Sequence, residues 1–416
     1  MALQFSWQIY KKHMIVAAII CEYNPFHNGH LRQLEMVRQR LGDDATIVGI
    51  MSGNYVQRGE LASAPKYRRA EVAIRCGCDL VLELPHPWSC SSAEFFARAG
   101  VRIADALGVV DVLCFGSESL PESAFPGTAA GTLDYSPEEE AAVVRVREYL
   151  CRMRALKLPA LPQRDGSSKL RAAETIYKEK YGEVAFFPTR PNDILAAEYI
   201  DALDSIGSKI LPLPMPRIKG LSATASRAAW ERGDFELLSQ LVPSQSLELC
   251  RRQGAPVSSE NLGIALPMHF LLSDPAQLAR CCDADGGLAE RLCKAAKRSA
   301  GPSELYANTA AKHLTAAKIR RAALFCLFGV TYDEVSAPPP YTLLLAANPR
   351  GTKLLRAIKK RSRIPVVTKP ADYRLLPEEA ARAFERSLRA DEVYMLATGE
   401  RENPIKMSPV ILQGNI

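Results

Sequence analysis

The sequence predicts an α/β protein, with a doubly wound parallel sheet followed by a mainly helical C-terminal domain. Two observations carry this prediction. Apolar runs alternate with helix-periodic segments over the first 120 residues, and strand signals fade from about residue 244 onward. Short links between alternating strands and helices imply parallel βαβ units with right-handed crossovers. At 416 residues the chain exceeds the size at which one core normally stays single, so we expect two domains.

The expected elements follow one another in a regular order. Residues 15–21 are a continuous apolar run, which is typical of a strand buried on both faces. Apolar residues at helical spacing then predict a helix that ends at Gly42. Further strands are expected at 46–53, 79–85, 110–118 and 208–214, and further helices at 66–77, 93–108, 190–203 and 221–233.

Changes in pattern divide the chain into three parts. The first expected strand starts directly after Met14, so we interpret residues 1–13 as an N-terminal extension. Residues 14–243 are expected to form the α/β domain, with a polar helical insertion at 119–185. Residues 244–416 are expected to form the mainly helical domain, interrupted by a proline-rich break.

Composition excludes several classes of protein. Apolar residues make up 47% and charged residues 24%, as in ordinary globular proteins. No apolar run approaches the roughly 20 residues needed to span a bilayer, and the N-terminus lacks the pattern of a secretory signal. The 11 cysteines are scattered and lack zinc-ligand spacing. We therefore expect reduced thiols, no structural metal site and a cytoplasmic location.

Positive charge is concentrated in the C-terminal part of the chain. The net charge is only +7, but residues 350–363 carry seven basic side chains and no acidic one. Residues 312–323 add Lys312, Lys318, Arg320 and Arg321. A surface that meets phosphates has this footprint, and so does a solvated helix face. Charge alone leaves both interpretations open.

Two of the six histidines stand three residues apart, where the first strand passes into the first helix. A helix start offers free N–H groups and the positive end of the helix dipole, so it binds anions. His27 and His30 can face the same ligand and stabilise charge on phosphate oxygens while pyrophosphate leaves. Gly29 removes a side chain where a nucleotide would press against the backbone. The alternatives are metal ligation, for which no third ligand stands out, and a structural role.

Three unusual loops follow strand ends in the α/β part. Their sequences are EYNPFHNGH, SGNYVQRGE and FGSE. In doubly wound sheets, ligands bind outside the carboxyl ends of the strands. We therefore expect these three loops to converge on one site.

The sequence HNGH resembles the HxGH signature of the nucleotidyltransferase superfamily, which shares its core with class I aminoacyl-tRNA synthetases. LSATASR (221–227) is similar to the second signature of that superfamily, with Ser226 where isoleucine is usual. A longer series of motifs is more specific: EYNPFHNGH, GNYVQRGE, CFGSE, RPNDILAAEY, KHLTAAKIRRAALF and NPRGTKLLRAIKKRSRIPVVTKP. By these motifs, residues 14 to about 373 resemble the bacterial tRNA(Met) cytidine acetate ligase family.

The resemblance implies a fold and a reaction. The fold would be a Rossmann-like nucleotidyltransferase of the HIGH type, with 14–243 as the ATP-binding catalytic domain and 244–416 as the tRNA-binding domain. Family members activate acetate with ATP to acetyl-adenylate and release pyrophosphate. They then acetylate the exocyclic amine of the wobble cytidine of elongator tRNA(Met). Acetate and this tRNA are the expected partners, with no membrane and no obligatory protein partner, and ATP is expected with Mg²⁺ but without a redox or organic cofactor.

The resemblance also implies site residues. His27 and His30 would be the catalytic pair. ATP would be bound by Ile20, Cys21, Glu22, Tyr23, Asn24, Pro25, Phe26, His27, Asn28, Gly29, His30, Leu31, Arg32, Gln33, Gly116, Asn192, Arg217 and Ile218. Additional phosphate contacts are expected from Lys219, Ser222, Thr224 and Arg227. The segment before Ser222 is shorter than the one that family members usually carry.

The basic helices would then contact tRNA. The expected residues are Lys318, Arg320, Arg321, Lys353, Arg356, Lys359, Lys360 and Arg361. Two other interpretations use the same signatures. A nucleotidyltransferase that acts on a small-molecule cofactor precursor would not need the basic C-terminal third. A non-catalytic, nucleotide-gated tRNA-binding protein is kept open by the shortened segment.

Overall fold

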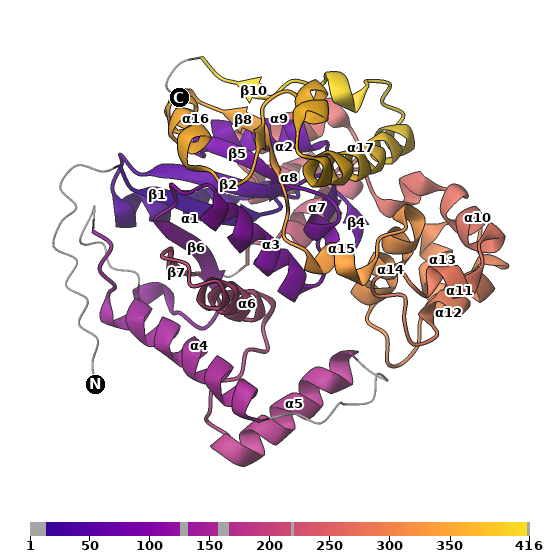
Figure 1. Ribbon diagram of the computed structural model, residues 1–416, viewed down its shortest axis with the longest axis horizontal. Coiled ribbons are helices and arrows are strands. Elements are labelled where there is room, and N and C mark those ends of the chain that lie inside the picture. The colour runs from indigo at the N-terminus through magenta and orange to yellow at the C-terminus, as the bar shows by residue number, and fades with distance from the viewer. Residues whose placement is uncertain (1–13, 125–131, 157–165, 218–219, 414–416) are drawn as a thin grey trace.

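The computed structural model describes residues 14–124, 132–156, 166–217 and 220–413 (Figure 1). Its centre is a set of parallel strands: β1 (Val16–Cys21), β2 (Thr46–Ser52), β5 (Leu80–Leu84), β6 (Val112–Ser117) and β7 (Leu211–Pro216). They lie in the order β5-β2-β1-β6-β7, so the order of strands along the chain reverses between β1 and β6. This is the order of a doubly wound sheet, and the predicted fold class is confirmed.

Helices connect these strands and flank the sheet (Figure 1). They are α1 (Asn28–Leu41), α2 (Lys66–Arg75), α3 (Ala93–Ala106) and α6 (Pro191–Ser205), and α7 (Ala223–Glu231) follows β7. The strands and helices expected in this part of the chain are present, with ends shifted by a few residues. β1 contains only apolar residues because both of its faces are covered: Ala17 and Ala18, which point to opposite faces, are 0% exposed.

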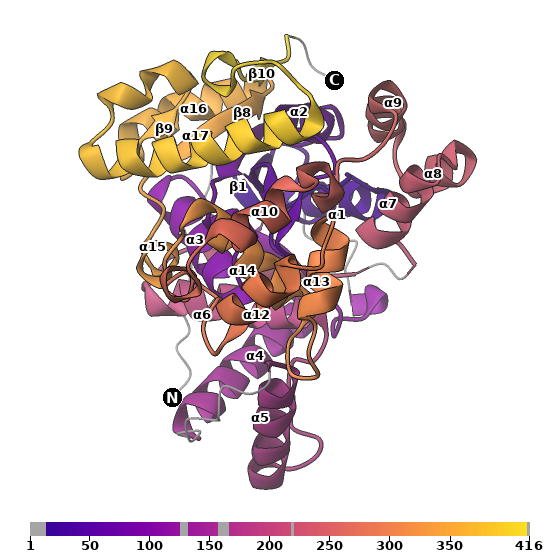
Figure 2. The same cartoon turned by 90° about the vertical axis from the view of Figure 1, so that its right-hand side faces the viewer.

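The described part of the chain between β6 and α6 is largely helical, and it includes two α-helices. They are α4 (Pro137–Ala155) and α5 (Gly166–Tyr181), which extend away from the sheet in Figures 1 and 2. Arg40 of α1 donates two hydrogen bonds, at 3.0 and 3.1 Å, to the carboxylate of Glu139 in α4. Both side chains are buried, so this ion pair fastens α4 to the sheet domain.

The chain beyond β7 is mainly helical, as predicted. Its helices are α8 (Phe235–Leu241), α9 (Ser244–Gln253), α10 (Ala265–Leu272), α11 (Pro275–Leu278), α12 (Leu288–Ala296), α13 (Pro302–Thr309), α14 (Ala316–Phe328), α15 (Tyr332–Ser336), α16 (Pro349–Arg361) and α17 (Glu378–Thr398). Helices α10 to α14 form a group at one side of the sheet, which is at the right in Figure 1 and faces the viewer in Figure 2. Leu266, Leu292 and Phe325 lie in the core of this group, together with Tyr394 of α17.

The C-terminal part also returns to the sheet, which sequence analysis does not predict. Strand β8 (Thr342–Ala347) pairs antiparallel with β5, and β9 (Val366–Val367) and β10 (Val410–Ile411) pair with β8. The prediction that residues 244–416 form a separate helical domain is therefore incorrect. The chain forms the group α10–α14 after leaving the sheet, and β8, β9 and β10 then add to the same sheet. The apolar run TLLLAA of β8 comes directly after the proline-rich break, which we interpreted as an interruption between helices.

A buried ionic cluster fastens the returning chain to the sheet. The Lys66 ammonium group lies 2.7 Å from Glu83 of β5 and 2.6 Å from Asp391 of α17. Asn54 donates to the second oxygen of Asp391 at 2.8 Å and accepts a hydrogen bond from the Lys66 N–H. The cluster thus joins α2, β5 and α17 to the loop that begins after β2.

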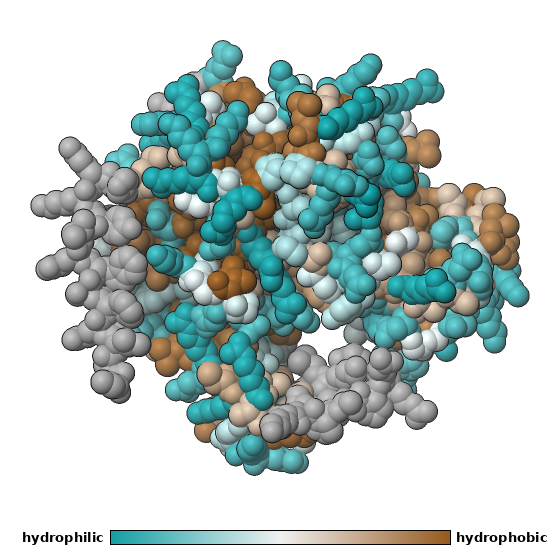
Figure 3. Space-filling view, viewed as in Figure 1, coloured by the Kyte–Doolittle hydropathy of each residue, from teal (hydrophilic) through white to brown (hydrophobic). Residues whose placement is uncertain are grey.

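Polar side chains cover most of the face seen in Figure 3, while apolar side chains are visible over the group α10–α14. The large exposed apolar residues there are Ile264, Met268, Leu271 and Leu272. Among the described helices, none combines the length and the apolar character needed to cross a bilayer.

Candidate active site

A cavity of about 320 Å³ opens at the carboxyl ends of β1 and β6, where the strand order reverses. Doubly wound sheets bind their ligands at this place, and the size is typical of a small-molecule site. The three loops converge on it as expected. Residues 20–24 end β1 and follow it, Gln57 and Arg58 lie between β3 (Tyr55–Val56) and β4 (Glu60–Leu61), and Phe115 and Gly116 belong to β6.

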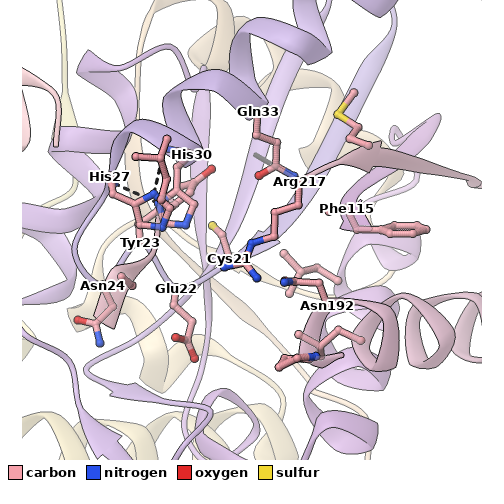
Figure 4. A pocket seen from close by; sticks show the side chains of 18 of the residues that line it. Cys21, Glu22, Tyr23, Asn24, His27, His30, Gln33, Phe115, Asn192 and Arg217 are labelled. Carbon is pink, nitrogen blue, oxygen red and sulfur yellow. Dashed lines mark hydrogen bonds between the residues drawn. The ribbon is translucent and has the colours of Figure 1, made fainter. Parts of the chain in front are cut away.

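The start of α1 forms one wall of the cavity. His27 and His30 line this wall and cap the helix (Figure 4). His27 is the N-cap residue, and its Nδ1 accepts the Gly29 N–H at 3.0 Å. His30 Nδ1 accepts the His27 N–H at 3.2 Å. The two rings stack with their centroids 3.7 Å apart. The pair thus takes the place of the hydroxyl and carboxylate that usually form a capping box.

These hydrogen bonds define which nitrogen of each ring carries the proton. In a neutral imidazole one nitrogen accepts and the other donates. Because Nδ1 of His27 and Nδ1 of His30 both accept backbone N–H groups, the proton of each neutral ring is on Nε2. The cap therefore leaves two Nε2–H donors at a helix start, which is an arrangement that favours an anion.

The imidazoles are expected to stay neutral at physiological pH. Burial, followed by the positive charges of Arg217 and Arg227, lowers the pKa of His27 from 6.5 to about 4. Burial and the neighbouring His27 likewise hold the pKa of His30 well below its usual value. Because the unfolded chain binds protons at these rings at a higher pH than the folded chain does, acid lowers the free energy of unfolding. The contribution of the neutral rings to stability is complete above pH 6.5 and is lost as the pH falls toward 4.

This assignment predicts an NMR result for the protein without nucleotide. We expect the imidazole ¹⁵N shifts of both residues to report a neutral ring with the proton on Nε2 at pH 7, and no titration above pH 5. Alanine variants of each residue assign the signals. A midpoint near 6.5, or a proton on Nδ1, would contradict the capping geometry.

Gly29 is required by the cap itself. A Cβ atom at this position would lie 2.8 Å from Cε1 and 2.9 Å from Nδ1 of His27. Any side chain would therefore push the His27 ring out of its capping position. Gly29 also lines the cavity, which agrees with the expectation that a ligand approaches the backbone here, but the close contact is with the histidine.

The opposite wall holds the other residues assigned to ATP. Gly116, Asn192 and Arg217 line the cavity from β6, α6 and the end of β7. Asn192 donates to Oε1 of Glu118 at 2.9 Å, and Arg217 donates to the same oxygen. Glu118 therefore holds both side chains, and a phosphate contact by Arg217 would require it to leave this carboxylate.

Asp193 builds the turn that carries Glu118, a role that sequence analysis missed. Its Oδ1 accepts hydrogen bonds from the Glu118 and Ser119 N–H groups, at 2.9 and 3.2 Å. It also accepts from the hydroxyl groups of Ser117 and Ser119. The motifs FGSE and RPNDIL are thus two sides of one hydrogen-bonded turn. The adjacent pair Asn192-Asp193 was the available signal: Asn192 lines the cavity, and Asp193 binds the turn at residues 118–119.

The second signature lies beside the cavity but its polar groups serve the fold. Ser222 caps α7 by accepting the Ala225 N–H, and Thr224 is exposed outside the lining. Arg227 donates to the Asn24 carbonyl at 2.7 Å, which fixes the loop after β1. Phosphate binding by these three residues stays a prediction. Ile218 and Lys219 lie outside the described residues.

Not every residue in the stretch 20–33 faces the cavity. The lining includes Ile20, Cys21, Glu22, Tyr23, Asn24, His27, Gly29, His30 and Gln33. Phe26 is buried instead, with its ring centroid 5.4 Å from that of His30, and Asn28 donates to a carbonyl of α8. Pro25, Leu31 and Arg32 are also absent from the lining. ATP binding by these five residues stays a prediction.

Sequence analysis missed the apolar wall. It is formed by Met36, Phe96, Phe115, Pro191, Leu195, Tyr199, Met215, Pro216, Leu221 and Ala223. These residues come from α1, α3, β6, α6, β7 and the start of α7, so no single motif contains them all. An apolar wall opposite a polar one is what a purine ring and a phosphate tail require.

The basic residues predicted to bind tRNA lie in two separate places. Those on α14 lie beside the loop that lines the cavity: Arg320 donates to the Arg58 carbonyl at 3.2 Å and pairs with Glu60. Gly59 packs so closely on this helix that a Cβ would be 2.4 Å from the Arg321 N atom. Lys318 and Arg321 pair with Asp285 and Asp283, which lie between α11 and α12.

Helix α16 lies at the other end of the sheet. Its N-cap residue, Asn348, donates to Asp79, which precedes β5, and Arg363 at its end donates to the Ala106 carbonyl, which precedes β6. Its basic residues Lys353, Arg356, Lys359, Lys360 and Arg361 are exposed. One strand length, roughly 20 Å for six residues, separates this helix from the cavity.

Glu22 is the one carboxylate in the cavity lining among the described residues. No group of three or more His, Cys, Asp or Glu side chains is placed to hold a metal ion in the described part of the chain. One carboxylate does not make a protein site for Mg²⁺. The lining is compatible with a Mg²⁺ ion that enters with ATP and keeps phosphate oxygens and water as its ligands.

Comparison with known proteins identifies the family. A family model described as HIGH Nucleotidyl Transferase matches residues 14–407. The chain is 32% identical over 406 residues to the tRNA(Met) cytidine acetate ligase of Thermoanaerobacter sp. (strain X514), over 92% of this chain and 96% of that protein. It is 33% identical over 418 residues to the tRNA(Met) cytidine acetate ligase of Syntrophotalea carbinolica, over 92% of this chain and 94% of that protein. The chain belongs to the tRNA(Met) cytidine acetate ligase family.

Solved structures of this family have the same fold. The crystal structure of Thermotoga maritima TmcAL bound with alpha-thio ATP (form II) matches 96% of this chain and 100% of that chain, with a TM-score of 0.80 and 28% identity. The apo structure of the same protein (form I) matches equally widely, with a TM-score of 0.79. The resemblance found in the motifs is confirmed, and with it the assignment of the chain to the tRNA(Met) cytidine acetate ligase family.

Proposed function

We propose that the chain is an ATP-dependent acetate ligase that acetylates the wobble cytidine of elongator tRNA(Met). The observation that carries this proposal is the pair of Nε2–H donors at the start of α1, inside the cavity at the strand-order reversal. The names of the relatives in its family supply the substrate class. Acetate as the acid, and Mg²⁺ as the ion that enters with ATP, are part of the proposal.

The first step is the attack of an acetate oxygen on the α-phosphorus of ATP. The adenosine would lie against the apolar wall near Gly116 and Asn192, and the triphosphate would point to the start of α1. His27 and His30 would donate from Nε2 to the oxygens on which charge grows as pyrophosphate leaves. Neutral imidazoles suit this role, because they can donate a hydrogen bond while neither ring has to give up its capping bond.

The second step transfers the acetyl group to the tRNA base. A duplex stem cannot enter a cavity of this size, so the wobble base has to leave the anticodon stack and insert. Gln57 and Arg58 line one side of the cavity, and Arg320 of the basic helix α14 contacts the Arg58 carbonyl. This side is the proposed entry for the anticodon loop.

A half-reaction separates this proposal from its nearest rival. We expect exchange of labelled pyrophosphate into ATP to require acetate and to proceed without tRNA. A nucleotidyltransferase that makes a cofactor would not respond to acetate, and a protein without catalysis would give no exchange. Exchange that is independent of acetate would overturn the proposal.

The two basic surfaces are tested by the salt dependence of tRNA binding. Each lost phosphate contact lowers the slope of log K against log salt concentration by about 0.7 to 0.9. If α16 contacts the tRNA backbone, a variant with Lys353, Lys359 and Lys360 changed to glutamine should bind more weakly, with a slope smaller by about 2 to 3. A matched control changes Arg154, Lys178 and Lys180 on α4 and α5. Unchanged affinity of the α16 variant would remove α16 from the interface and leave α14.

A further inference from the structure

Acetyl transfer to the base needs a proton acceptor, and the inference below rests on the proposed function. The amine nitrogen bonds to the acetyl carbon, the bond between that carbon and the phosphate oxygen of AMP breaks, and one proton leaves the amine. A positioned base contributes about 10²- to 10⁴-fold to such a step. Formation of acetyl-adenylate needs no base, because acetate is already an anion.

The two histidines cannot take this proton while they cap α1. Their Nδ1 atoms accept the backbone N–H groups of Gly29 and His27, and their Nε2 atoms carry protons. Both rings are therefore donors toward the cavity. Accepting a proton would also place a positive charge on one of two buried rings that stack with their centroids 3.7 Å apart.

The thiol and phenol groups of the lining are also unsuitable. Burial raises the pKa of the Cys21 thiol and of the Tyr23 and Tyr199 hydroxyl groups. These groups are therefore protonated at neutral pH and have no free basic form. Arg58 and Arg217 are cations, and amides such as Asn24, Gln33 and Asn192 are not bases.

Glu22 remains, and its geometry fits the role. It directly follows β1 at the strand-order reversal, between the start of α1 and the wall at Asn192 (Figure 4). One carboxylate oxygen, Oε1, accepts the Gln57 N–H at 2.8 Å. The other, Oε2, has no hydrogen-bond partner among the residues that the structure describes. The backbone is held as well, since the buried Arg69 donates to the Glu22 carbonyl at 2.5 Å and to the Ser52 carbonyl at 3.0 Å.

We propose that Glu22 is the general base of acetyl transfer, with Oε2 taking the proton from the exocyclic amine of the cytidine. A nucleotide that lies across the strand-order reversal has its α-phosphate over the end of β1. The acetyl carbonyl, which is bonded to that phosphate, then lies beside Glu22. The amine enters from the side of Gln57 and Arg58, so the carboxylate lies between the two reactants.

The surroundings tune this carboxylate toward basicity. Burial raises the pKa of Glu22, and the Gln57 N–H and the charges of Arg227, Arg69 and Arg58 oppose this effect. Arg69 comes from α2, Arg227 from α7 and Arg58 from the loop after β3, so cations face Glu22 from three sides. A carboxylate with a raised pKa is a stronger base, and burial outweighs the opposing cations at Glu22.

Glu22→Gln tests the proposal, because its Oε1 can still accept the Gln57 N–H. The matched control is Glu248→Gln, which removes an exposed carboxylate paired with Arg75. Two rates are measured for wild type and both variants. The first is acetate-dependent pyrophosphate exchange, and hydroxylamine trapping of acetyl-adenylate confirms that the variants are folded and active. The second is single-turnover transfer of labelled acetyl from preformed acetyl-adenylate to a tRNA(Met) transcript, as a function of pH.

We expect Glu22→Gln to lower transfer by about 10²-fold or more, and to lower transfer by far more than exchange or trapping. The wild-type transfer rate should rise with pH until Glu22 is ionised, and the variant should lack this rise. Equal transfer rates would overturn the proposal and leave the AMP phosphate or water as the acceptor. Equal loss of both rates would overturn it too, because Glu22 would then act in activation. If the wild type gives no transfer at all, the proposed function fails, not this assignment alone.

Discussion

Alanine in place of both His27 and His30 is expected to lower acetate-dependent pyrophosphate exchange by more than the 10²- to 10³-fold loss typical of one removed oxyanion donor. The two Nε2–H groups act where charge grows on the leaving pyrophosphate, so their loss should appear in kcat. The measurement is the rate of exchange at saturating ATP and acetate. His313→Ala, which lies outside the cavity lining, is the control.

Asparagine variants separate catalysis from helix capping. The Asn side-chain oxygen can stand near the position of Nδ1, and Asn is a good N-cap residue. His27→Asn should therefore keep α1 folded and its melting temperature close to wild type while exchange is lost. If the His27→Asn/His30→Asn double variant exchanges at the wild-type rate, the pair serves only the cap, and the central role given to it is wrong.

Asp391→Ala is expected to lower the free energy of unfolding by about 3–5 kcal/mol, the usual cost of removing one partner from a buried ion pair. Lys66 is 4% exposed and would keep Glu83 as its one remaining carboxylate partner in the described structure. Asn54 would lose the acceptor of its side-chain N–H group. The measurement is the denaturant midpoint and the melting temperature, followed with a probe on the sheet and one on the group α10–α14.

A surface ion pair of the same helix is the matched control for this loss. Arg382 pairs with Glu378 on α17, and both side chains are more than 70% exposed. Arg382→Ala should change stability by less than about 0.5 kcal/mol, because solvent screens such pairs. A loss below about 1 kcal/mol in Asp391→Ala would show that the buried cluster does not fasten α17 to the sheet.

The α/β core could be predicted because its signals are local. A strand buried on both faces is an apolar run, as in residues 16–21, and the helices that follow have helical spacing. The HNGH motif fell at a strand–helix junction, and that position alone predicts a cavity with an anion at the helix start. The sequence could therefore place His27 and His30 correctly relative to the sheet.

The remaining features depend on contacts between distant parts of the chain. The pairing of β8 with β5 joins residues more than 250 positions apart, so nothing local to TLLLAA specifies it. The apolar wall is assembled from six elements. The choice of Nδ1 as the capping atom, and hence of Nε2 as the donor, depends on ring orientation. Ser222 and Arg227 have residue types that suit phosphate, but in the fold they cap α7 and hold the Asn24 carbonyl.

Single-turnover transfer of labelled acetate to a tRNA(Met) transcript tests the central claim most directly. With ATP present, we expect one acetyl group per tRNA, attached to the nucleoside at the wobble position, and no label on a transcript in which that cytidine is replaced by uridine. Label on both transcripts, or no label on either while acetate-dependent exchange proceeds, would contradict the account.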